Sequence, residues 1–192
     1  MKKMLVLMCL LFAVITNAQE KTSLKDVKEL TFFGVDFSQA KVFGADETVN
    51  QFKDAFTGIN NLFLREPKKY DTGKAFNAKV TMDLTPSLDL VDGISKDNLF
   101  TQDENYVLSD EQIAKSISHL KLGDAQGYGA IIMAGLLNKG RNKETLNVIV
   151  FNIETKDIIF NQQYTEGARG FGLRNFWAYP VYKVLGKVKK VK

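Results

Sequence analysis

The chain has 192 residues, of which 45% are hydrophobic and 25% charged, and its formal net charge is +4. This length fits one domain, or one domain with an appendage. Without five lysines near the C-terminus the chain is slightly acidic, so the charge gives no basic face of the kind that binds nucleic acid. These lysines are Lys183, Lys187, Lys189, Lys190 and Lys192.

Residues 1–18 have the three parts of a secretory signal peptide. Lys2 and Lys3 are followed by an unbroken apolar run and then by Thr-Asn-Ala, so we predict cleavage after Ala18. An uncleaved anchor is the alternative, but a stable membrane span needs about 20 apolar residues and this run is shorter. We therefore expect an exported protein, periplasmic or surface-associated, with no transmembrane segment after cleavage.

Cys9 is the only cysteine. It lies inside the apolar run, whereas a lipid-attachment cysteine should follow that run. Cleavage would remove Cys9 and two lysines, which lowers the net charge to +2. The mature chain can then have neither a disulfide nor thiol chemistry, and its core alone must hold it.

The first half of the mature chain predicts a strand, a helix and a second strand. Residues 19–29 are polar and predict a flexible lead-in, and residues 30–38 are apolar on both alternating sets, as in a strand covered on both faces. Residues 45–64 predict a helix with Asp46 as N-cap and an apolar stripe at helical spacing. Residues 76–84 alternate between apolar and polar, which predicts a strand with one wet face. The stripe consists of Val49, Phe52, Phe56, Ile59 and Phe63.

The second half begins with a short helix from Pro86, followed by a loop over residues 95–105. Ser109 and Gln112 have the spacing of a capping box and predict a further helix. Residues 127–137 predict a central strand, and residues 145–153 and 157–165 predict a hairpin. A closing helix from about Trp177 to Lys189 carries a last apolar stripe, namely Trp177, Val181, Val184, Leu185 and Val188.

These elements predict one α+β domain over residues 30–192. Because the strand at 76–84 has a wet face, we expect a mixed open sheet of about five strands with helices mainly on one face.

The order of elements in the C-terminal half resembles envelope modules typified by the N-terminal domain of TolB and by CsgG. In those modules a D-x-x-T-G-x-V turn often joins the last two strands, and "NIETKDII" (Asn152–Ile159) is similar, with Lys156 in place of the glycine. The segment "GFGLRNFWAYPVYK" also resembles the closing motif of uncharacterised secreted bacterial proteins. The resemblance implies a periplasmic or surface-associated module that binds a partner.

Catalytic motifs are sparse. His119 is the only histidine and lies near a helix end, where a charged histidine suits the helix dipole. Asp36 and Asp83 each lie near the end of a predicted strand, and two carboxylates brought together could hydrolyse a glycoside. We predict no catalytic residue, no metal site and no cofactor.

The segment "GARGFGLRNFWAYP" (Gly167–Pro180) leaves two interpretations open. A glycine loop before a helix suits an anion such as a phospholipid headgroup, with Arg169 and Arg174 as bidentate donors. The alternative is a turn into the closing helix, with Asn175 as N-cap, Pro180 near the first turn, and Phe171, Phe176 and Trp177 packed over the core edge.

We therefore expect a non-catalytic binding or assembly module of the bacterial envelope, whose partner is an envelope protein, peptidoglycan or a small ligand. The alternative is a small hydrolase that uses carboxylates on envelope or extracellular carbohydrate. The oligomeric state is open. The candidate binding residues are Arg169, Arg174, Asn175, Trp177 and Tyr179.

Overall fold

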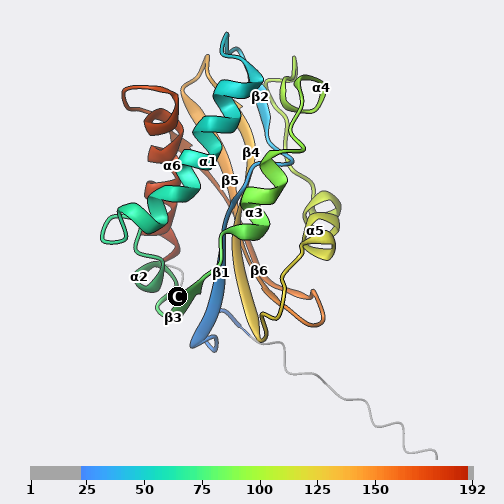
Figure 1. Cartoon of the computed structure of the whole chain (residues 1–192), viewed down its shortest axis with the longest axis vertical. Helices are drawn as coiled ribbons and strands as arrows, with labels where there is room; N and C mark the ends of the chain where they lie inside the picture. The colour runs from blue at the N-terminus through green and yellow to red at the C-terminus, as the bar shows by residue number, and fades with distance from the viewer. Residues whose placement is uncertain (1–22, 190–192) are drawn as a thin grey trace, which may run out of the picture.

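A computed structural model describes residues 23–189 and shows one mixed six-stranded sheet (Figure 1). The strands run in the order β3-β1-β4-β5-β6, and β2 pairs separately with β4. Pairing is parallel between β1 and β3, β1 and β4, and β2 and β4, and antiparallel along β4-β5-β6. The strand bounds are β1 Glu29–Asp36, β2 Lys41–Phe43, β3 Lys79–Met82, β4 Tyr128–Asn138, β5 Lys143–Asn152 and β6 Ile158–Gly167.

Most of the helices pack on one face of this sheet, which confirms the α+β prediction. Helices α1 and α6 lie side by side there, with α2 below them (Figure 1). The other face has a smaller apolar cluster, in which α5 covers Phe33, Ile131 and Ile149. The helices are α1 Val49–Arg65, α2 Thr72–Phe76, α3 Thr85–Val91, α4 Lys96–Leu99, α5 Asp110–His119 and α6 Leu173–Val188.

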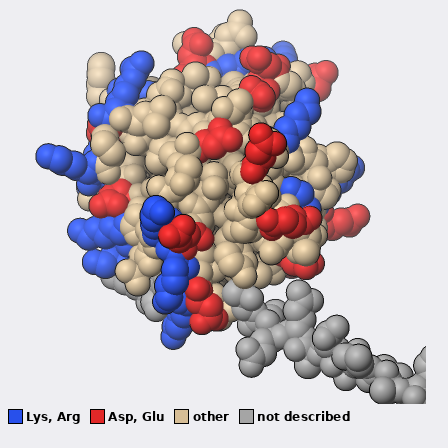
Figure 2. Space-filling view, turned by 60° about the horizontal axis from the view of Figure 1, so that its bottom comes forward, with Lys and Arg blue, Asp and Glu red and all other residues tan. Residues whose placement is uncertain are grey.

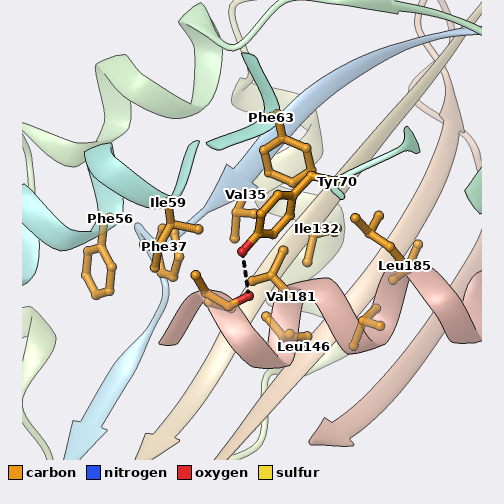
Figure 3. Close-up of a cluster of buried hydrophobic side chains, with 14 of the residues drawn as sticks. Val35, Phe37, Phe56, Ile59, Phe63, Tyr70, Ile132, Leu146, Val181 and Leu185 are labelled. Carbon is orange, nitrogen blue, oxygen red and sulfur yellow. Dashed lines mark hydrogen bonds between the residues drawn. The ribbon is translucent and has the colours of Figure 1, made fainter. Parts of the chain in front are cut away.

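The aromatic stripe of α1 forms much of the main core, as predicted. Phe56 stacks on Phe37 with ring centroids 3.9 Å apart, and Phe63 packs against Phe32 at 4.8 Å (Figure 3 shows the cluster). The N-cap is Thr48, not Asp46. Thr48 and Gln51 form a reciprocal capping box, which Asp46 cannot form because the apolar Val49 lies three residues after it.

A bulge in β1 is held by one side chain of α1. The register of β1 against β4 shifts between Phe32 and Val35, and Gly34 between them has φ +87°. Asn60 is fully buried; its Oδ1 accepts from the Val35 N–H (2.7 Å), and its Nδ2 donates to the Val35 carbonyl (2.9 Å). Asn60 thus satisfies both backbone groups that the bulge removes from the strand ladder.

Some predicted elements differ from the structure. The strand predicted over residues 76–84 contains only β3, because the buried Phe76 ends helix α2 and Asn77 turns the chain in a left-handed conformation. The predicted loop after Gly93 contains α4, and the short strand β2 was not predicted. The predicted signal peptide lies outside the described residues.

The described part of the predicted flexible lead-in is packed against the domain. Leu24 and Val27 are buried in the main core, and β1 begins at Glu29. Apolar side chains three residues apart in a mostly polar segment are enough to fasten it.

Candidate functional site

A hollow of about 550 Å³ lies between the end of α1 and the start of α6, and we call it the α1–α6 hollow. Four of the five predicted binding residues line it: Arg169, Arg174, Asn175 and Tyr179. Its other wall includes Leu62 and Glu66 at the end of α1, and Lys69 and Tyr70 in the loop that follows. The fold thus joins segments that are about 100 residues apart in the sequence.

The two arginines are exposed, and the aliphatic stem of Arg174 lies over Gly58 of α1. The Arg169 guanidinium lies 4.1 Å from the centre of the Tyr179 ring, a cation–π contact. Arg174 donates from Nε and Nη2 to the Asn175 Oδ1 (3.2 and 3.0 Å). Within residues 23–189 neither guanidinium has an ion-pair partner. Both therefore have N–H donors free for a ligand.

The polar side chains of the opposite wall, Glu66, Lys69 and Tyr70, have partners within the chain. Lys69 pairs with Glu66 at 3.3 Å, and its ammonium lies 5.2 Å from the centre of the Tyr70 ring. The Tyr70 hydroxyl donates to the Ala178 carbonyl of α6 (3.4 Å), as Figure 3 shows. Burial raises the pKa of Tyr70, so this phenol is a neutral donor at pH 7. Tyr70 therefore ties the two walls together.

The loop from Gly167 to Gly172 lies tightly against α6. Gly170 has φ +138°, and a Cβ there would be 2.9 Å from the backbone carbonyl of Asn175. Only glycine allows this approach. Phe171 is 96% exposed, so the prediction that it packs over the core edge was wrong.

Helix α6 begins at Leu173, four residues before the predicted start, and this changes the roles of two residues. Asn175 is not the N-cap, because Gly172 occupies that position. The Nδ2 of Asn175 instead donates to the Phe171 carbonyl (3.1 Å). Pro180 lies inside the helix rather than near its first turn. The positive φ of Gly172, +79°, lets the chain enter the helix earlier than the proline suggested.

Trp177 faces the core, unlike the other candidate binding residues. It is fully buried and stacks edge-on against Phe176 at 4.9 Å. The predicted apolar stripe of α6 is buried at all five positions. Trp177 does not line the hollow, so its contribution is to hold α6 in place.

The two acids considered for catalysis, Asp36 and Asp83, each accept a hydrogen bond from a backbone N–H two residues further along the chain. Asp36 is buried and accepts from the Ser38 N–H (2.7 Å), and Asp83 accepts from the Thr85 N–H (3.0 Å). Burial raises the pKa of Asp36. His119 is exposed, with Nδ1 2.7 Å from the Lys115 carbonyl.

A buried acid pair was missed by the sequence reasoning. Glu144 faces Glu166 across β5 and β6, and Lys187 pairs with Glu166. Glu144 is fully buried, no hydrogen-bond partner is found for its carboxylate among residues 23–189, and burial raises its pKa well above the usual range. The predicted strand began at Thr145, two residues after the start of β5. Extending the alternation of Leu146 and Val148 back by one step would have placed Glu144 inward.

The surface beside the α1–α6 hollow is rich in lysine. A second hollow of about 540 Å³ between α2 and the end of α6 is lined by Lys68, Lys74 and Lys183, among others. In Figure 2 many Lys and Arg side chains gather at the left of the view, the side on which α2 and α6 lie in Figure 1, with acidic side chains among them. Over the part of the chain that the structure describes, no three metal-binding side chains come together, and no helix is long and apolar enough to cross a bilayer.

Comparison with known proteins gives little. No protein-family model and no curated protein matches the sequence. Among solved structures, the chain is similar to the LpoB C-terminal domain from Salmonella enterica, with 14% identity and a TM-score of 0.33, over 73% of this chain and 84% of that one. A similarity at this level carries no argument about function, and the resemblance to TolB and CsgG modules stays a prediction.

Proposed function

We propose that this chain is an exported, non-catalytic module of the bacterial envelope that binds an anionic group of its partner in the α1–α6 hollow. One observation supports the proposal: two exposed guanidiniums that have no ion-pair partner among residues 23–189 line one hollow together with tyrosines. Secretion rests on the signal-peptide pattern of residues 1–18.

The chemistry of the hollow favours a carboxylate or a phosphate. A guanidinium binds either group through two parallel N–H donors. Tyr179 covers the face of Arg169, which leaves the donor edge of the guanidinium free. The tyrosine rings and Leu62 give the hollow apolar walls for the rest of the ligand. Acidic segments of envelope proteins, the carboxylates of peptidoglycan peptides and small anions all meet this requirement.

No observation favours the hydrolase alternative. Glu66 is the one carboxylate among the residues that line the hollow, and it is paired with Lys69. A glycosidase needs two carboxyl groups roughly 5–10 Å apart in one cleft.

The proposal is tested with the mature protein as bait for envelope extract and for isolated peptidoglycan. Arg169→Ala/Arg174→Ala should lower the bound amount about tenfold or more, because each lost bidentate contact is charge-assisted. The matched control is Arg65→Ala/Arg141→Ala, which removes the same charge from exposed positions outside the hollow. Equal binding by the two double variants would refute the proposal, provided that circular dichroism shows both folded.

A further inference from the structure

Strand β6 forms an edge of the sheet, and the edge is long. It has ten residues and pairs only with β5 among the described strands, whereas the opposite edge strand β3 has four. Asn161, Gln162, Gln163 and Thr165 are exposed along it. The backbone N–H and C=O groups that point away from β5 therefore lack ladder partners within the sheet.

Most of this edge, residues 158–165, lacks the usual protection against pairing, and the inward charge of the strand, Glu166, lies beyond this stretch. Edge strands are commonly blocked by lysine, by proline or by inward charges. Residues 158–165, "IIFNQQYT", contain no charge, no proline and no glycine. A bulge interrupts the pairing with β5 at Ile159, but the register is regular from Phe160 to the end of the strand.

The side chains of the edge are arranged as a palindrome of residue types about Gln162. Phe160 and Tyr164 lie two positions on either side of Gln162, and Asn161 and Gln163 lie one position on either side. In an antiparallel pair of identical strands related by a two-fold axis, residues at equal distances from the axis face each other. Each aromatic ring would then face an aromatic ring, which is a favourable cross-strand pair. Gln163 would face Asn161, whose amide already accepts from Asn147 (3.0 Å) and donates to Asp110 (3.0 Å) in its own chain, so the aromatic pairs carry the complementarity.

The faces of the sheet agree with this arrangement. Phe160 pairs with Val150 and Tyr164 with Leu146, and all four belong to the apolar cluster under α6. Gln162 points to the same side but is exposed, so α6 leaves the centre of the edge uncovered. Nothing in the described residues therefore blocks the axis position.

We propose that β6 pairs antiparallel with β6 of a second copy, centred on Gln162, so that two copies share one continuous sheet. The occupant is a second copy rather than an unrelated strand because the order of residue types is self-complementary. The surface is separate from the α1–α6 hollow and does not depend on the proposed function.

Sedimentation velocity of the chain from Gln19 onward, over a range of concentrations, tests the pairing. Wild type should show a monomer–dimer equilibrium. Gln162→Lys places two like charges at the axis and should weaken the dimer about tenfold or more. Gln126→Lys adds the same charge at an exposed position away from β6 and should change nothing. A wild type that stays monomeric, or a dimer insensitive to Gln162→Lys, overturns the proposal.

A cysteine test fixes the register, since the chain from Gln19 has no cysteine. Directly opposed residues have Cα atoms about 4.5–5.5 Å apart, within disulfide reach. Gln162→Cys should therefore cross-link on mild oxidation. Gln163→Cys would face Asn161 of the second copy and should cross-link far less. Equal cross-linking of the two variants would overturn the proposed register.

Discussion

Asn60 provides the sharpest test of how the fold is held. Replacing Asn60 with alanine removes both hydrogen bonds to Val35, of 2.7 and 2.9 Å, and leaves the Val35 N–H and carbonyl buried without partners. An unsatisfied buried polar group costs about 1–3 kcal/mol. Two such groups give a loss of about 2–6 kcal/mol in the free energy of unfolding, a large share of the roughly 5–15 kcal/mol that stabilises a domain.

Urea unfolding followed by circular dichroism measures this loss. Asn50→Ala on the same helix is the matched control, because Asn50 is exposed and its replacement reports only the helix propensity of alanine. The m-value should stay unchanged if the variant unfolds from the same fold. A corrected loss below about 1 kcal/mol would refute the view that the Val35 N–H and carbonyl depend on Asn60 for their hydrogen bonds.

Two further predictions concern Gly170 and Glu144. Both Gly170 and Gly172 have positive φ, so alanine is strained at either position, but only at Gly170 would its Cβ collide with α6. Gly170→Ala should therefore lower the free energy of unfolding in urea by about 1 kcal/mol more than Gly172→Ala does. Gly170→Ala should also weaken binding in the α1–α6 hollow. Because burial raises the pKa of Glu144, the folded state keeps a proton that the unfolded state loses, and stability falls as pH rises above the ordinary value of 4.5 toward the raised one. Glu144→Gln should remove this fall and raise the thermal midpoint at pH 7 but not at pH 4; parallel pH profiles for the two proteins would contradict it.

Periodicity was a reliable guide where one pattern extended over a whole element. The stripe of α1, the capping box of Ser109 and Gln112, and the hairpin of β5 and β6 are all present as predicted. In each case local spacing and core burial favour the same structure.

Periodicity did not predict the bounds of elements where one apolar pattern runs through two elements, or where tertiary contacts determine where an element begins. Phe76 alternates in phase with Val80 and Met82, yet it ends a helix, because Asp71 caps α2 five residues earlier. The start of α6 depends on Gly172 and on the contact of Gly170 with Asn175, which spacing alone does not reveal. The partner of Asn60 lies 25 residues earlier, in a bulge whose register only the assembled sheet defines.

The α1–α6 hollow and the free edge of β6 are close in the sequence, and yet they can act separately. Arg169 follows β6 directly, but its loop is fastened within the chain, since the Ala168 N–H donates to the Asn142 carbonyl (2.7 Å). Helix α6 lies between the hollow and the free edge of β6, with Tyr179 on the hollow and Trp177 in the core. Pairing at β6 would therefore leave both hollows of a dimer open, and on a polymeric partner two linked sites bind more tightly than one without any new contact. If both proposals hold, this gain in avidity would be the advantage of self-association for a module whose single hollow binds through exposed arginines.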